Sequence, residues 1–113
     1  MSNHILIEKQ ISKFNKKIFV SSDKSISIRT VLLASQAVGI SKISNLLESE
    51  DVLNTLKTIK KLGINYRKKA NTYIIEGFGL NGFDTQNKVT IDAGNSGTLA
   101  RLILGLLVKS KKK

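Results

Sequence analysis

The chain has 113 residues, enough for one modest domain, and 41% of them are hydrophobic although only 5% are aromatic. It has no cysteine and a single histidine, which excludes disulfides, thiolate chemistry and any zinc site built on cysteine. The net charge of +11 suggests nucleic-acid binding at first sight, but 16 of the 19 basic residues are lysine, so we interpret it as a compositional bias towards Lys, Ile and Asn.

The first predicted elements are two short strands and a helix. Apolar runs at residues 5–7 and 18–20 flank a polar, lysine-containing stretch and predict the strands. A largely apolar run of helical length then occupies residues 24–38. Gly39 follows it and is a suitable residue to end a helix.

A strand, a second helix and a hairpin are predicted next. Residues 40–46 are a strand candidate, and Ser49 can cap a helix over 50–62 whose first turn holds two acids. Apolar residues recur in it at three-to-four spacing until Gly63. The alternation in residues 64–68 and 72–76 predicts a β-hairpin.

The last part of the chain begins like the first. After a glycine-rich connector at 77–87, residues 88–92 predict a strand and residues 98–108 a third helix. The fold class is therefore α/β (α+β), in the order strand, helix, strand, helix, strand, strand, then strand and helix. Residues 109–113 form a basic tail.

Both predicted strand-to-helix loops suit an anion, because the free N–H groups and the positive dipole end of a helix N-terminus point into such a loop. In the first loop Lys24 supplies a charge, and Ser25 and Ser27 supply hydroxyls. Arg29 lies one helical turn after Ser25. An ordinary capped, solvated turn is the alternative interpretation.

The second loop, residues 92–98, has two glycines around an asparagine and a serine. Gly97 lets the backbone approach a ligand closely, and Asn95, Ser96 and Thr98 can donate hydrogen bonds to it. Arg101 lies one turn into the helix. An ordinary capped turn remains the alternative here too, but two such loops, each followed by an arginine, favour a functional site for a phosphate or carboxylate.

Three motifs give the chain a family resemblance. Residues 23–29 (DKSISIR) resemble the D-K-S-x-S-x-R signature of EPSP synthases, and residues 92–98 with Arg101 and Leu102 resemble their G-N-S-G-T-x-x-R-L signature. Between them, residues 47–56 are similar to the family's S-x-D-V-x-x-T helix. The chain thus resembles the N-terminal portion of the EPSP synthase (3-phosphoshikimate 1-carboxyvinyltransferase) family over about residues 20–108.

The resemblance departs from the family pattern at two places. Ser21 and Ser22 stand where the family usually has Pro-Gly, and Ile28 stands where it often has His or Asn. The first change puts the rigidity of the loop in doubt, while the ligand-binding groups are all present.

The resemblance implies an enolpyruvyl transferase fold, with two globular halves of three β-α-β-α-β-β units each. Residues 1–19 are then strands of the other half, 20–76 one complete unit, 77–87 a connector and 88–108 the first strand and helix of the next unit. The chain is expected to be an incomplete portion that needs the remainder of the enzyme and is inactive alone.

The resemblance also implies a reaction: transfer of the enolpyruvyl group of phosphoenolpyruvate to the 5-hydroxyl of shikimate 3-phosphate, with release of phosphate and without metal or cofactor. Lys24, the implied catalytic residue, would contact both substrates. Ser25 and Arg29 would hold shikimate 3-phosphate. The groups implied to line the pocket for phosphoenolpyruvate and glyphosate are Asn95, Gly97 and Thr98, with Arg101 as support.

Other readings differ in partner. UDP-N-acetylglucosamine enolpyruvyl transferases share the implied fold but have Lys-Asn where this chain has Lys24 and Ser25. A small basic nucleic-acid-binding module would need clustered arginines or aromatic platforms, and the four phenylalanines are scattered. We expect a cytoplasmic protein, since the N-terminus lacks a signal-peptide layout and no apolar run reaches the roughly 18–20 residues of a membrane helix.

Overall fold

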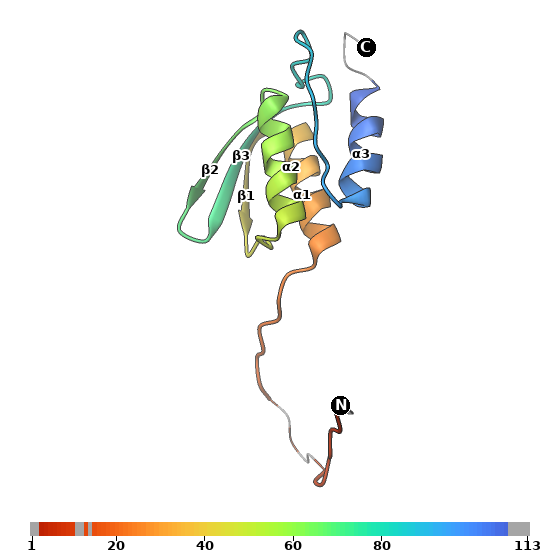
Figure 1. Cartoon of the computed structure of the whole chain (residues 1–113). Coiled ribbons are helices and arrows are strands. Elements are labelled where there is room, and N and C mark those ends of the chain that lie inside the picture. Colours follow the sequence, from red (N-terminus) through yellow and green to blue (C-terminus); the bar gives the residue numbers. More distant parts are fainter. Residues whose placement is uncertain (1–2, 11–12, 14, 109–113) are drawn as a thin grey trace.

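The computed structural model describes residues 3–10, 13 and 15–108. Two of the three helices pack on one face of a three-stranded sheet, the third packs against the first helix on the side away from the sheet, and the segment before the first helix runs away from this body (Figure 1). The elements follow one another in the order α1 (Lys24–Gln36), β1 (Val38–Ser44), α2 (Glu50–Lys61), β2 (Asn65–Lys69), β3 (Thr72–Phe78) and α3 (Gly97–Leu107).

The strands form an open antiparallel sheet in the order β1-β3-β2. In the central strand, Ile74 lies opposite Lys42 of β1 and Arg67 of β2. The predicted hairpin is confirmed: β2 and β3 are joined by a tight turn in which Ala70 has a φ of 52°. Alternate β3 residues, such as the fully buried Ile75, face the helices.

The core between the helices and the sheet is aliphatic, as the composition predicts. In α2, Val52, Leu56 and Ile59 are at most 1% exposed, whereas Lys57 and Lys60 lie on the solvent side. Burying each such aliphatic side chain stabilises the fold by about 1.5–3 kcal/mol. The amphipathic pattern therefore fixes which face of α2 meets the sheet.

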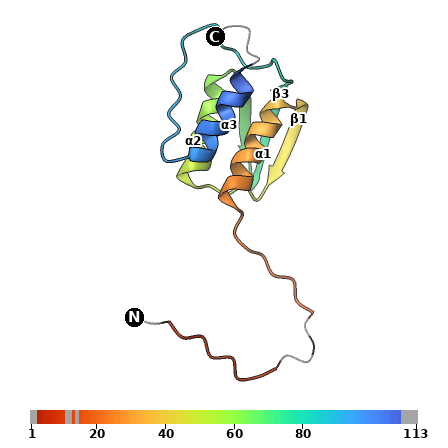
Figure 2. The ribbon, with the colours of Figure 1, turned by 90° about the vertical axis from the view of Figure 1, so that its right-hand side faces the viewer.

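All three helices run in the same direction and begin at the same end of the molecule (Figures 1 and 2). α1 is the central helix, because it packs against α2, α3 and β3. The loops that precede α1 and α3 are consequently presented at one end of the helical layer.

The three predicted helices are confirmed, with changes at their ends. α1 ends at Gln36, two residues early, where the N–H of Ala37 donates to Leu33 O at 3.0 Å. Gly39 therefore lies inside β1 and does not end the helix. Ser49 occupies the N-cap of α2, but its buried hydroxyl makes no capping hydrogen bond, so the prediction of a side-chain cap is wrong.

Three strand predictions are wrong for the chain as described: residues 5–7, 18–20 and 88–92 form no strand. A strand needs a hydrogen-bonding neighbour, and none lies beside these segments. The side chains of 5–7 and 18–20 are 71–90% exposed. Residues 88–92 run along the helical layer, where Lys61 Nζ donates to Thr90 O at 2.9 Å. The described part of the 20–76 unit therefore reads α-β-α-β-β. Its assignment as a complete unit of a larger enzyme, like that of 1–19 to another half, stays a prediction.

Candidate active site

The first turn of α1 contains backbone N–H groups that have no acceptor within the helix. Asp23 is the N-cap, and its Oδ1 accepts from the N–H of Ile26 at 2.7 Å, while Ser27 N donates to Asp23 O at 3.0 Å. The N–H groups of Lys24 and Ser25 have no acceptor within the helix. These two residues of the predicted site thus offer backbone donors as well as side chains.

The start of α3 repeats this arrangement. Ser96 is the N-cap, its Oγ accepts from Leu99 N at 3.0 Å, and Ala100 N donates to Ser96 O at 3.1 Å. The N–H groups of Gly97 and Thr98 are therefore the ones without an intrahelical acceptor. Ser96 itself is only 3% exposed, and its hydroxyl oxygen caps the helix. The prediction that Ser96 donates a hydrogen bond to a ligand is therefore wrong.

The loop before α3 is shaped by its own contacts. Asp92 Oδ1 accepts from Gly94 N at 2.8 Å, and Gly94 has a φ of 54° and lies against the side chain of Asn54 in α2. Asn95 and Gly97 are exposed and Thr98 is half-buried. The loop is thus held against α2 while the predicted ligand-binding residues face outward.

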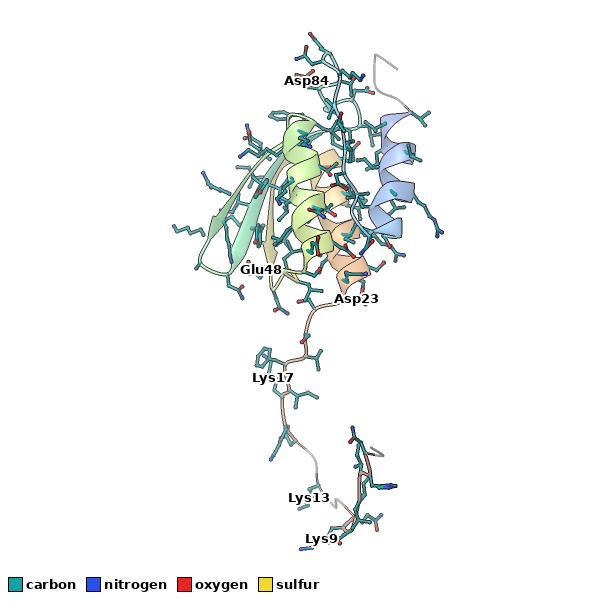
Figure 3. The ribbon with its side chains drawn as sticks, in the orientation of Figure 1. Lys9, Lys13, Lys17, Asp23, Glu48 and Asp84 are labelled. Atoms are coloured by element: carbon teal, nitrogen blue, oxygen red, sulfur yellow. The ribbon has the colours of Figure 1, made fainter. Side chains whose placement is uncertain are left out.

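The three parallel helices bring positive dipole ends together. The first turns of α1 and α3 contain no acidic residue, whereas that of α2 contains Glu50 and Asp51. Asp23 and Glu48 lie at this end of the molecule and Asp84 at the opposite end (Figure 3). An anion placed near α3 therefore meets an uncompensated first turn, whereas at α1 the Asp23 carboxylate already caps the start of the helix.

Lys24, the predicted catalytic residue, forms an ion pair with Asp51. Lys24 Nζ lies 2.9 Å from Asp51 Oδ2, and the side chains are 53% and 13% exposed, respectively. The more buried carboxylate fixes the direction of the lysine, whose head still reaches solvent. On the sequence alone, Asp51 is assigned only to the first turn of α2, where it complements the helix dipole. Asp51 lies in the motif at residues 47–56, and this was the sequence signal that connects it to the site.

The two arginines of the predicted site are both exposed. Arg29 is exposed at a groove between α1 and α3, beside Leu102 and Leu106, and Arg101 is exposed on α3. Within the described ranges neither arginine forms an ion pair with a carboxylate. Both guanidinium groups remain available to an anionic ligand or partner.

One residue of the first motif has a structural role instead of the predicted one. Ser27 is 4% exposed, and its Oγ accepts from Leu47 N at 3.2 Å. Ser22 Oγ also donates to the carbonyl oxygen of Asn45. These bonds tie the start of α1 to the loop that leads into α2, so Ser27 serves to hold that loop.

A second cluster fixes the other side of that loop. Tyr73 Oη donates to Glu48 Oε1 at 2.7 Å, and Lys68 forms an ion pair with the same carboxylate. The hydrogen bonds from Lys68 and Tyr73 lower the pKa of Glu48 below its usual 4.5. Burial, followed by the hydrogen bond to Glu48, raises the pKa of Tyr73 to about 12. The loop is thus anchored to α1 and to the hairpin just before Asp51.

Two further findings bear on the class of protein. Across the residues the structure describes, no group of three or more His, Asp or Glu side chains could hold a metal ion. No helix in this part of the chain is long and apolar enough to cross a bilayer. The fold and the site define an α/β protein in which two helix N-termini lie at one end, a lysine is directed by Asp51, and two arginines form no ion pair within the described residues.

Comparisons with known proteins identify the family of this chain. A sequence model of the family EPSP synthase (3-phosphoshikimate 1-carboxyvinyltransferase) matches residues 8–113. The chain belongs to the EPSP synthase family. It is 39% identical over 107 residues to a 3-phosphoshikimate 1-carboxyvinyltransferase of Alkaliphilus metalliredigens, with 95% of this chain and 25% of that protein covered. For the Persephonella marina enzyme of the same name the values are 42% over 104 residues, 89% and 24%.

The fold comparison agrees. The solved EPSP synthase from Acinetobacter baumannii superposes with a TM-score of 0.75 at 33% identity, covering 85% of this chain and 22% of that one. The predicted family and the mixed helix-and-strand fold class are therefore confirmed. The chain spans about a quarter of the length of these relatives.

Proposed function

We propose that this chain supplies part of the active site of an enzyme that transfers the enolpyruvyl group of phosphoenolpyruvate to the 5-hydroxyl of shikimate 3-phosphate. The hydroxyl oxygen bonds to the enolpyruvyl carbon, the bond from that carbon to the phosphate oxygen breaks, and phosphate leaves while the hydroxyl proton is released. The observation that carries the proposal is the pair of open helix N-termini at one end of a chain of the EPSP synthase family.

The proposal gives each predicted residue a role. Lys24 contacts both substrates, and Ser25 and Arg29 hold shikimate 3-phosphate. Asn95, Gly97 and Thr98 line the phosphoenolpyruvate pocket, with Arg101 in support. Two substrates that are both polyanions suit these loops, because backbone N–H groups and helix dipoles bind phosphate and carboxylate oxygens without any cofactor.

Asp51 adds a positioning role to this set. Its ion pair at 2.9 Å holds the Lys24 ammonium at the α1 end that offers free N–H groups. A flexible lysine alone would sample many rotamers, and fixing one lowers the entropy cost of ligand binding. We place Asp51 in the site as the group that directs Lys24.

The chain by itself is expected to show no enolpyruvyl transfer and only weak substrate binding. Its site is open to water, where charge contacts are screened and worth little. Catalysis needs charged groups and a proton donor that converge from opposite sides, and the remainder of the enzyme must supply them. A cytoplasmic location is part of the proposal, because phosphorylated substrates do not cross membranes unaided.

The test joins this chain to the remainder of the Alkaliphilus metalliredigens relative and measures phosphate release. Lys24→Ala and Arg29→Ala should each lower kcat/KM by roughly 10²-fold or more, because preorganised charge contacts to phosphate are worth several kcal/mol. Lys57→Ala, which removes an exposed lysine from α2, is the matched control and should change the rate less than about twofold. Unchanged rates in both site variants would refute the residue roles.

A further inference from the structure

Hydrogen bonds within the loop before α3 fix its shape but not its place. Asp92 Oδ1 accepts from Gly94 N at 2.8 Å, and Ser96 N donates to Ala93 O at 3.0 Å. Both bonds join residues of the same short segment, so they form the turn without holding it at any distance from the start of α1. The place of the loop in the site therefore depends on its contacts with other elements.

The helix α2 supplies two of these contacts. Lys61, its last residue, donates from Nζ to Thr90 O at 2.9 Å and so holds the segment that leads into the loop. Near the other end of α2, the half-buried Asn54 has its Nδ2 2.9 Å from the position that a Cβ on Gly94 would take. The Asn54 amide thus lies directly beside the backbone of the loop.

Asn54 also lies one helical turn after Asp51. Residues three apart share one side of a helix and are about 4.5 Å apart along its axis. Asp51 forms the ion pair with Lys24, so a single turn of α2 contacts both the catalytic lysine of the proposed site and the loop at residues 92–98. The spacing between these two parts of the site is then set by a rigid helix.

We infer that Asn54 is a positioning residue of this site, whose amide fixes the loop at residues 92–98 as Asp51 fixes Lys24. The inference rests on the proposed function and adds a residue to it. The amide fills the space on the α2 side of Gly94, and the next residue, Asn95, is exposed. No heavy atom would lie within 4 Å of a Cβ added to Gly97. The loop is thus supported at one end and open at the other.

This position gives Asn54 a substrate preference. Without its amide, the loop can relax into the vacated space, because protein interiors are close-packed and partly refill a cavity. The donors proposed for phosphoenolpyruvate then move, whereas Ser25 and Arg29, proposed for shikimate 3-phosphate, belong to α1 and stay in place. Loss of Asn54 should therefore weaken the binding of phosphoenolpyruvate alone.

The contact is tested on the 113-residue chain by a double-mutant cycle. Gly94→Ala is made in wild type and in Asn54→Ala, and urea unfolding is followed by circular dichroism. The urea midpoint should fall less in the Asn54→Ala background, because the new methyl group then has room and only the strained backbone of residue 94 remains. An equal fall in both backgrounds would overturn the inference.

The positioning role is tested in the chain joined to the remainder of the Alkaliphilus metalliredigens relative. Asn54→Ala should raise the KM for phosphoenolpyruvate by roughly threefold or more and leave that for shikimate 3-phosphate within about twofold. Alanine favours helix more than asparagine does, so a purely structural role of Asn54 offers no reason for such a split. Lys57→Ala, an exposed position one turn further along α2, is the matched control and should leave both values within about twofold.

Asn54→Leu keeps a branched side chain of similar size, so it should hold the KM for phosphoenolpyruvate within about twofold of wild type. The inference is overturned if Asn54→Leu is as impaired as Asn54→Ala, if Asn54→Ala binds phosphoenolpyruvate normally, or if both KM values rise together. Failure of the proposed function looks different, because Lys24→Ala and Arg29→Ala would then both keep wild-type rates. Slow Lys24→Ala and Arg29→Ala enzymes beside a normal Asn54→Ala enzyme would refute the role of Asn54 alone.

Discussion

Alanine is expected to have different effects at the two glycines of the loop before α3. Gly94 has a φ of 54°, and an alanine there pays about 1–2 kcal/mol for the left-handed conformation. A Cβ at Gly94 would also lie 2.9 Å from Asn54 Nδ2, so that amide must shift. Gly94→Ala should therefore lower the free energy of unfolding by about 1–2 kcal/mol.

Gly97 has neither constraint. It is the first residue of α3, it does not have a positive φ, and no heavy atom would lie within 4 Å of an added Cβ. Gly97→Ala should leave the free energy of unfolding unchanged or raise it by up to about 1 kcal/mol, because alanine restricts the unfolded chain. Nothing in the described fold thus requires glycine at this position.

Urea unfolding followed by far-UV circular dichroism measures both changes on the 113-residue chain. Gly94→Ala should lower the midpoint, and Gly97→Ala should leave it unchanged or raise it, with the same urea dependence in both variants. A loss of more than about 1 kcal/mol in Gly97→Ala would show that the space beside it is occupied and that the loop geometry is wrong.

The same substitution tests the proposed site. In the chain joined to the remainder of the relative, Gly97→Ala should raise the KM for phosphoenolpyruvate, because the new methyl group stands beside the open N–H groups of α3. Gly94→Ala should act mainly on stability. An unchanged KM in Gly97→Ala would remove Gly97 from the phosphoenolpyruvate pocket.

Three further substitutions give separate readouts. Ser96→Ala removes the α3 cap and should lower the free energy of unfolding in urea by about 1 kcal/mol. A change of less than about 0.3 kcal/mol would show that the Ser96 side chain does not stabilise the helix start. Because folding raises the pKa of Tyr73 from 10.0 to about 12, its stabilising contribution is complete below pH 10 and is lost as the pH rises towards 12. Thermal melts should therefore show a fall over this range in wild type that Tyr73→Phe reduces, and parallel curves would contradict it. Asp51→Asn should change the free energy of unfolding by less than about 1 kcal/mol, since Lys24 is half exposed. It should nevertheless raise the substrate KM of the joined enzyme. Wild-type kinetics in this variant would show that the ion pair has no positioning role.

The helices and the hairpin could be predicted because their signals are local. In α2 the three-to-four spacing of Val52, Leu56 and Ile59 and the lysines between them determine both the element and its buried face. The turn at Ala70 lies between two alternating runs and needs no distant information. Such elements follow from the periodicity of apolar residues within the segment itself.

The strands predicted at residues 5–7, 18–20 and 88–92 are not formed in the described fold, and the local sequence could not show this. An apolar run of strand length shows that a segment can join a sheet, but whether a neighbour is present depends on tertiary structure. Residues 88–92 bury Val89 and Ile91 in part against the helical side instead. The segment resembles a strand only in that alternate residues, Val89 and Ile91, are partly buried.

The site was predictable to the level of its loops. The motifs placed Lys24 and Thr98 at helix starts, as the structure shows, because capping residues mark such starts in the sequence. The bond from Leu47 N to Ser27 and the ion pair to Asp51 join residues 20 and 27 positions apart, so no local pattern reveals them. The roles of the site residues in catalysis remain predictions.

The tyrosines of the hairpin determine what spectroscopy can see in this protein. The chain has no tryptophan and two tyrosines, Tyr66 and Tyr73, whose ring centroids lie 6.4 Å apart. Intrinsic ultraviolet fluorescence therefore comes from the sheet, and it changes when the hairpin opens. The loops before α1 and α3 carry no such chromophore, so ligand binding there gives no direct optical signal unless a tryptophan is introduced beside them.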